Sequence, residues 1–220
     1  MQSRTIAVAT HGRYLLEVPP GSEPHPLLVG FHGYAENADI HLEQLLRIPG
    51  ADAWVVVAVQ GLHRFYDRKS ERVLAGWMTR QDRELAIADN VQYVRRIVDA
   101  LRGEGIGRGP LVYAGFSQGV AMAYRAAAFA GHACAGLVVL GGDVPPDLDD
   151  RAIAGLPPVL LGRGRDDAWY TGAKAEADLA RLQAHGAAVT PVVFDGGHEW
   201  GAPFVESSGR FLAQIRLSFR

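Results

Sequence analysis

A serine lies between two glycines at residues 115–119, which read Gly-Phe-Ser-Gln-Gly and match the pattern G-x-S-x-G. An apolar run over 111–114 leads into this motif, and an alanine-rich segment typical of a helix follows it. In a sharp strand-to-helix turn the serine hydroxyl is held clear of the sheet, and the helix directs its N-terminal amides at developing negative charge. Glycines at 115 and 119 remove side chains that would collide across such a turn. The motif therefore predicts Ser117 as a nucleophile.

A serine hydroxyl needs a neighbouring base to accept its proton, and His198 is the best placed of the eight histidines. It follows an apolar run over 189–194 and lies in a glycine-rich stretch ahead of the last helical segment. The residues after His198 do not complete an H-E-x-x-H zinc motif, so no metal site is expected there. His32 is expected to support a loop, and no catalytic role is assigned to the remaining six: His11, His25, His41, His63, His132 and His185.

The third group should be a carboxylate at the end of a strand between the serine and the histidine. An apolar run over 159–161 is followed by two candidates, Asp166 and Asp167, while Asp195 is a weaker competitor. Such a carboxylate fixes the tautomer of the histidine and stabilises the imidazolium. The chain order serine, aspartate, histidine is the order of α/β-hydrolases rather than of the two well-known protease classes.

Backbone amides are needed to hold the oxyanion that forms when the serine attacks a carbonyl. One is expected from the residue after the nucleophile, Gln118, and the other from the loop after an early strand. Residues 30–35 read Gly-Phe-His-Gly-Tyr-Ala after an apolar run over 27–31, which makes the amide of Tyr34 the second candidate.

The elements that would position these residues alternate between strands and helices. Near-continuous apolar runs are typical of parallel strands covered on both faces, and the helical segments between them imply right-handed crossovers. We therefore expect one α/β domain over residues 1–220, of the α/β-hydrolase fold class, with a mostly parallel sheet flanked by helices. The predicted strands are 27–31, 53–59, 111–114, 137–140, 159–161 and 189–194, and the predicted helices are 82–101, a segment after Ser117, 173–185 and 203–217.

Two further segments flank this pattern. Residues 5–9 and 13–18 surround His11 and Gly12 and predict an antiparallel hairpin at one sheet edge. Residues 61–80 are predicted to form a long loop that carries charges and aromatic side chains, as binding loops of α/β proteins do.

The net charge and the cysteine content exclude several classes of partner and site. The formal net charge is −2 and the basic clusters are short, so nucleic acid is not an expected partner. Cys134 is the only cysteine, which excludes an intrachain disulfide and a cysteine-based zinc site. Neither a secretory signal nor an apolar stretch long enough to span a bilayer is visible, so a cytoplasmic location is the default expectation. No cofactor is expected, and a homodimer is one oligomeric state left open.

At these residues the sequence resembles the phospholipase/carboxylesterase family, which includes acyl-protein thioesterases and small bacterial carboxylesterases. The similarity rests on His-Gly at 32–33, the motif at 115–119, a glycine three residues before Asp167, and Gly-His-Glu at 197–199. The resemblance implies Asp167 rather than Asp166 as the acid, and Tyr34 and Gln118 as oxyanion donors. The chain departs from the family pattern at Ala35, at Arg163 and around Trp77, where relatives usually carry glycine, histidine and Trp-Phe-Asp.

The expected reaction is hydrolysis of a carboxylic ester, or of a thioester or lysophospholipid, through an acyl-enzyme. Three tryptophans near the expected active face are candidates for an apolar substrate pocket: Trp77, Trp169 and Trp200. Alternatives are a ligand receptor that keeps the fold without catalysis, a peptidase and a lactonase, since fold alone does not determine function.

Overall fold

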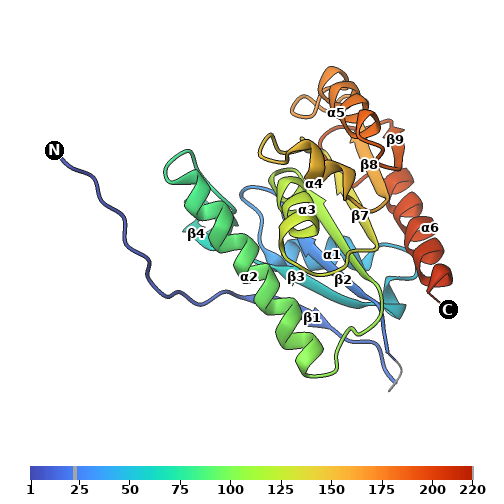
Figure 1. Ribbon diagram of the computed structural model, residues 1–220, viewed down its shortest axis with the longest axis horizontal. Coiled ribbons are helices and arrows are strands. Elements are labelled where there is room, and N and C mark those ends of the chain that lie inside the picture. Colours follow the sequence, from blue (N-terminus) through green and yellow to red (C-terminus); the bar gives the residue numbers. More distant parts are fainter. Residues whose placement is uncertain (22–23, 220) are drawn as a thin grey trace.

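The computed structural model describes residues 1–21 and 24–219 and is built around one seven-stranded sheet (Figure 1). The strand order is β1-β3-β2-β6-β7-β8-β9. All neighbouring strands are parallel except β1 and β3, which pair antiparallel. The strands are β1 (Tyr14–Glu17), β2 (Leu27–Phe31), β3 (Val55–Val59), β6 (Leu111–Phe116), β7 (Gly136–Leu140), β8 (Val159–Gly164) and β9 (Val189–Phe194).

Helices cover both faces of the sheet, and each face has its own apolar core. On one face, α2 and α3 pack against side chains such as Tyr113 and Val139. On the other face, α6 and the end of α1 pack against side chains such as Val112 and Val138. The helices are α1 (Ala38–Leu46), α2 (Arg83–Gly103), α3 (Gln118–Phe129), α4 (Asp150–Ala154), α5 (Gly172–Ala184) and α6 (Ala202–Ser218), with a short 3₁₀ turn at Ala51–Ala53.

The mostly parallel sheet with flanking helices confirms the predicted fold class, with one exception in burial. Strands β2, β3, β6 and β7 are buried throughout, as continuous apolar runs require. The last strand, β9, lies at the sheet edge, and Val193 is 47% exposed. The expectation of a fully buried strand over 189–194 was therefore wrong, because an edge strand is covered less well; its Pro191 is typical of such a position.

The register of the parallel strands brings their carboxyl ends together. Phe31 of β2 pairs with Gly115 of β6, and Phe116 of β6 pairs with Leu140 of β7. The residues that follow these strands therefore meet at one edge of the sheet, where parallel α/β proteins place their sites.

The antiparallel pairing at the N-terminal end is present, but its partner differs from the expected hairpin. Tyr14 to Glu17 pair with β3, and residues 1–13 form neither helix nor strand. Figure 1 shows the first residues leading away from the body of the protein. The short apolar run over 6–9 does not by itself determine strand pairing, since the backbone hydrogen bonds of β1 go to β3 and not to residues 5–9.

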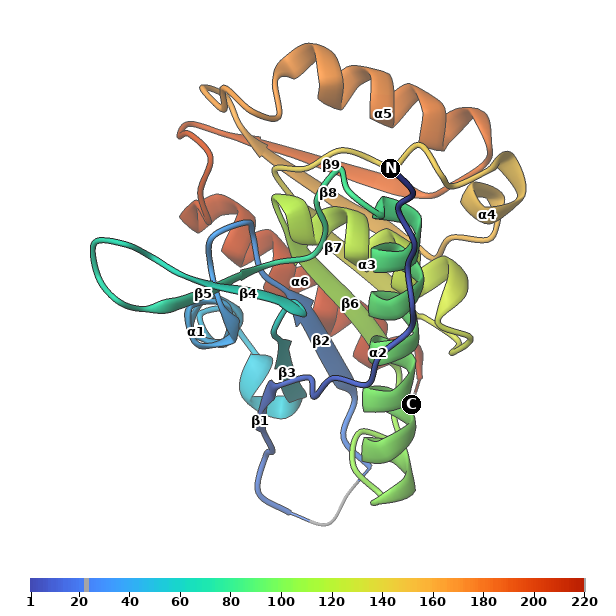
Figure 2. The ribbon, with the colours of Figure 1, turned by 90° about the vertical axis from the view of Figure 1, so that its left-hand side faces the viewer.

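Residues 61–80, predicted as a loop, contain a second, two-stranded sheet. Strands β4 (His63–Tyr66) and β5 (Val73–Gly76) pair antiparallel, and the hairpin projects beyond α1 (Figure 2). It is joined to the main body by the bridge between Glu36 and Ala75. No helix in the described part of the chain combines the length and apolar character needed to cross a bilayer.

Candidate active site

Ser117 occupies the turn between β6 and α3 with φ 52° and ψ −119°. Such a conformation is strained for a residue other than glycine, and the backbone segments that flank Ser117 pack closely against other backbone atoms. A Cβ on Gly115 would lie 2.5 Å from the carbonyl oxygen of Gly119, and one on Gly119 would lie 2.0 Å from that of Phe31. Only glycine fits at both positions, which is the physical reason for the G-x-S-x-G pattern.

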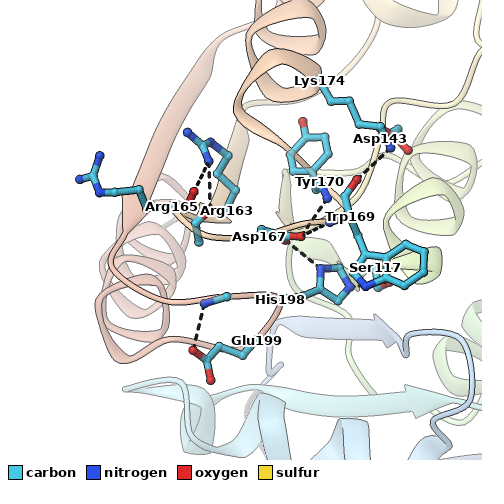
Figure 3. A network of polar contacts seen from close by, with 12 residues as sticks. Ser117, Asp143, Arg163, Arg165, Asp167, Trp169, Tyr170, Lys174, His198 and Glu199 are labelled. Atoms are coloured by element: carbon cyan, nitrogen blue, oxygen red, sulfur yellow. Dashed lines mark hydrogen bonds and ion pairs between the residues drawn. The ribbon is translucent and has the colours of Figure 1, made fainter.

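The structure brings together the three side chains predicted from separate strand ends (Figure 3). His198, in the loop after β9, has its Nε2 atom 2.8 Å from the Oγ of Ser117. Its Nδ1 atom is 2.8 Å from Oδ2 of Asp167, in the loop after β8. In the neutral tautomer with the proton on Nδ1, the imidazole donates to the carboxylate and accepts from the serine hydroxyl. This arrangement can remove a proton from Ser117 as it attacks an electrophilic carbon.

Asp167 is buried, with 4% of its surface exposed, and it is held by three hydrogen bonds. Its Oδ1 atom accepts from the amides of Trp169 and Tyr170 at 2.8 and 2.9 Å, while Oδ2 accepts from His198. Burial alone would raise the pKa of Asp167, but the hydrogen bonds from His198 and the two amides outweigh it and hold the pKa below its usual value. The carboxylate is thus kept ionised beside the imidazole.

The two competing acids are placed elsewhere. Asp166 is exposed, and its backbone amide bonds to the carbonyl of Gly196. Asp195 is 91% exposed in its side chain and pairs with Arg165 at 2.9 Å. Only Asp167 among the three contacts His198.

The imidazole ring of His198 is enclosed on two sides. Phe116 lies against it with the ring centroids 4.9 Å apart. Gly141, which follows β7 and has φ 68°, leaves room for it, because a Cβ there would lie 3.1 Å from the Cε1 atom of His198. Gly141 was not among the predicted site residues; the glycine pair at 141–142 directly after an apolar run is the feature of the sequence that indicates it.

The loop after β2 lies against the nucleophile, as expected for an oxyanion loop. A Cβ on Gly33 would lie 3.3 Å from the Cβ of Ser117. Within residues 1–21 and 24–219, the amides of Tyr34 and Gln118 have no hydrogen-bond acceptor. Two amides near the serine with no acceptor are suited to bind an oxyanion.

Glu36 holds this loop in shape and was not identified from the sequence. Its Oε2 atom accepts the amide of Gly33 at 2.7 Å, and its Oε1 accepts from Gln44 at 3.3 Å. Burial raises the pKa of Glu36 above its usual value. Ala35 adopts φ 59°, a left-handed conformation that favours glycine.

His32 supports the same region as a neutral side chain. Its Nδ1–H donates to the carbonyl of Gly33 at 2.6 Å, and its Nε2 accepts the amide of Gly61 at 3.0 Å. Burial lowers the pKa of His32 to about 4, which suits a ring that must both donate and accept. This placement agrees with the expected loop-supporting role.

A cavity of about 440 Å³ opens beside Ser117. Trp169 lines it and is 74% exposed, and Figure 3 shows its indole beside Ser117. Gln118 and Met78 also line it, and the side chain of Gln118 accepts from the amide of Trp77 at 2.8 Å and donates to the carbonyl of Met78 at 3.2 Å.

Trp77 and Trp200, which were also expected to line a substrate pocket, lie in the core instead. Trp77 is fully buried; it packs edge-on against Phe31 and donates to the carbonyl of His32 at 2.8 Å. Trp200 is 6% exposed and packs against Phe116 and Phe204. Their positions next to loop residues in the sequence were misleading, because both indoles turn inward to cover apolar side chains.

In the described part of the chain, no group of three or more His, Cys, Asp or Glu side chains is arranged to hold a metal ion. Cys134 lies just before β7, and burial raises the pKa of its thiol to about 11.

A mostly parallel sheet covered by helices, with Ser117, Asp167 and His198 following β6, β8 and β9 in that order, defines an α/β-hydrolase fold. The model of the phospholipase/carboxylesterase family matches residues 18–215. The chain therefore belongs to the phospholipase/carboxylesterase family.

Solved structures agree on the fold. A carboxylesterase from Bacillus cereus has a TM-score of 0.70 at 20% identity, with 93% of this chain and 94% of that chain covered. Acyl-protein thioesterase 2 from Zea mays has a TM-score of 0.73 at 18% identity, covering 93% and 99%. A phospholipase/carboxylesterase from Dyadobacter fermentans has a TM-score of 0.66 at 19% identity, covering 94% and 99%. A comparison with curated protein sequences found no match.

Proposed function

We propose that the protein is a serine hydrolase that cleaves carboxylic esters, thioesters included, through an acyl-enzyme on Ser117. The observation that carries this proposal is the pair of 2.8 Å contacts that join Ser117 to His198 and His198 to Asp167. Membership of the phospholipase/carboxylesterase family supports the reaction class.

The proposed reaction has two steps. The Oγ of Ser117 attacks the ester carbonyl carbon while its proton passes to Nε2 of His198, and the amides of Tyr34 and Gln118 bind the oxyanion. The imidazolium returns its proton to the leaving alcohol or thiol, and the acyl group stays on Ser117. Water then attacks the acyl-enzyme with His198 as base and releases the carboxylic acid. Asp167 stabilises the imidazolium in both steps.

The charges of the residues that line the cavity beside Ser117 indicate which substrates it favours. Three cations line it, namely Arg80, Arg83 and Lys174, and Lys174 pairs with the one acid in the lining, Asp143, at 3.5 Å. Within the described residues, Arg80 and Arg83 make no ion pair within 4.0 Å, and the nearest acid whose pKa Arg83 helps to lower, Asp147, is already held by Arg125 at 2.6 Å. We propose that this surplus of positive charge favours esters that carry a carboxylate or phosphate group in addition to the scissile bond.

Labelling with a fluorophosphonate tests the reaction class, since this reagent modifies an activated serine. The protein should gain one adduct, on the peptide that contains Ser117, and should lose activity toward p-nitrophenyl esters in proportion. A panel of p-nitrophenyl esters, acyl thioesters and lysophospholipids then ranks the substrates. A protein that neither reacts with the reagent nor hydrolyses any member of the panel would refute the proposal and favour a ligand receptor.

A further inference from the structure

A second cavity, of about 600 Å³, lies at the end of the sheet opposite to Ser117. It is bordered by residues just ahead of three central strands: Pro26 before β2, Pro110 before β6 and Ala135 before β7. Ser117 follows the other end of β6, so the six residues of that strand place the two cavities about 20 Å apart. The cavity is therefore separate from the site of hydrolysis.

The charge in this lining has one sign. Arg102, Arg108 and Arg216 line the cavity together with His25, and none of the described residues in the lining is acidic. The nearby Asp99 is already engaged, because its Oδ1 lies 2.8 Å from Nε2 of His132. Three guanidinium groups around one cavity give it a positive potential, which attracts an anion.

Two buried polar atoms at this cavity have no hydrogen-bond partner within residues 1–21 and 24–219. They are Nε of Arg102 and Nε2 of His25. Leaving a buried donor unsatisfied costs about 1–3 kcal/mol, and more when the group is charged, so such atoms are normally satisfied by ordered water or by a ligand, and these two can donate to an anion that enters the cavity.

The positions of two arginines at helix C-termini account for part of the positive charge, but not for the donor atom of Arg102 that has no partner. Arg102 lies in the last turn of α2 and Arg216 in the last turn of α6, where cations are favoured by the helix dipole. Arg108 belongs to no helix, and Nε of Arg102 bonds to no carbonyl of its own helix end. Helix dipoles therefore do not account for the presence of all three arginines around one cavity.

The remaining wall is apolar and includes Leu111, Ala133 and Phe219. We propose that this cavity binds a small organic anion, a carboxylate or phosphate group on an apolar body, at a site distinct from that of hydrolysis. The guanidinium groups would hold the anion by charge-assisted hydrogen bonds, and the apolar wall would cover the body of the ligand.

Cys134 provides a built-in reporter, since it lines this cavity and is the only cysteine in the chain. Because burial raises the pKa of this thiol to about 11, alkylation by N-ethylmaleimide is slow; at fixed pH and ionic strength its rate, followed by intact mass, reports a change in the access to and charge of the cavity. The protein is first blocked at Ser117 with fluorophosphonate, and 1-naphthyl phosphate or 1-naphthoate is then added. At a concentration ten times its Kd, either probe should slow alkylation about tenfold, and the effect should saturate.

Variants and a neutral probe decide the interpretation. Arg102→Gln/Arg108→Gln should lose the protection, whereas Arg96→Gln, an exposed change on the same helix α2, should keep it. Calorimetric titration of the same variants checks binding without the thiol, and thermal unfolding checks their fold. No saturable protection by either anion, equal protection by neutral 1-naphthalenemethanol, or full protection in the double variant would each overturn the proposal. Protection by one anion and not the other supports it and identifies the group that is bound.

Discussion

The amide of Ser117 donates a hydrogen bond to the carbonyl of Leu140, with the two atoms 2.9 Å apart. The residue that ends the turn after β6 is thus tied to the end of the neighbouring strand β7. A residue at φ 52° and ψ −119° keeps that conformation only when its surroundings enforce it, and this bond is one such constraint. The hydrogen bond to Leu140 therefore helps to hold both the strained backbone of Ser117 and the position of its hydroxyl group.

Two substitutions at Ser117 should separate activity from stability. Ser117→Ala removes the nucleophile and should reduce ester turnover on the order of 10⁴-fold or more, with the free energy of unfolding within about 1 kcal/mol of wild type. Ser117→Gly should be equally inactive, but its free energy of unfolding should exceed that of Ser117→Ala by about 1 kcal/mol, because glycine adopts this conformation without strain. Urea unfolding and p-nitrophenyl ester assays measure both. A glycine variant less stable than the alanine variant would contradict the account of strain.

Neutralising Asp167 should impair His198 as a base, whereas neutralising the adjacent Asp166 should have little effect on catalysis. Asp167→Asn should lower kcat by about 10³- to 10⁴-fold, because the amide no longer stabilises the imidazolium or selects its tautomer. The matched control is Asp166→Asn, one residue away and exposed, which should retain near wild-type kcat. If Asp166→Asn were the more damaging change, the acid would have been misassigned.

Trp200, which is buried, and Trp169, which is exposed, should respond differently to truncation. Trp200→Ala should lower the free energy of unfolding by about 3–5 kcal/mol, because the indole fills space between Phe116 and Phe204. Trp169→Ala removes an exposed indole and should leave stability near wild type while raising KM for aryl esters about three- to tenfold. Chemical unfolding and steady-state kinetics on both variants test this. Equal stability of the two variants would place Trp200 outside the core.

The charge of the cavity beside Ser117 should appear as a substrate preference. Relative to neutral p-nitrophenyl valerate, kcat/KM for mono-p-nitrophenyl glutarate should be higher by about tenfold at low salt and should fall as salt is added. Arg80→Gln/Arg83→Gln should abolish the preference without affecting the neutral ester, and Arg96→Gln should preserve it. A preference for the neutral ester in wild type would refute this substrate class while leaving the reaction itself intact.

Stability should depend on pH through His32. Because its folded pKa is about 4 and the ordinary value is 6.5, the unfolded chain takes up a proton first as the pH falls. Its contribution is complete above pH 6.5 and is lost between pH 6.5 and 4, amounting to about 3 kcal/mol. His32→Gln should be less stable at pH 7 and should reduce the slope of the unfolding free energy against pH over that range, measured by urea titration. The remaining slope should come from the buried His41, whose pKa burial lowers to about 3. An unchanged slope would show that His32 does not titrate there.

The sequence alone indicated the central strands, the parallel sheet and the three residue types at strand ends in the order serine, aspartate, histidine. Continuous apolar runs reveal buried strands because both faces of a parallel sheet are covered. A glycine-flanked serine between strand and helix is recognisable because only glycine fits that turn. These are local patterns, readable without knowing the neighbours in space.

Only the tertiary structure decided which side chains meet. The choice of Asp167 depends on the direction of a loop after β8, and the burial of Trp77 and Trp200 depends on apolar surfaces contributed by distant segments. The partner of β1 and the pairing of β4 with β5 are likewise long-range. Hydrogen-bond reach and burial are properties of atoms brought close by folding, so residue type and spacing along the chain do not determine them.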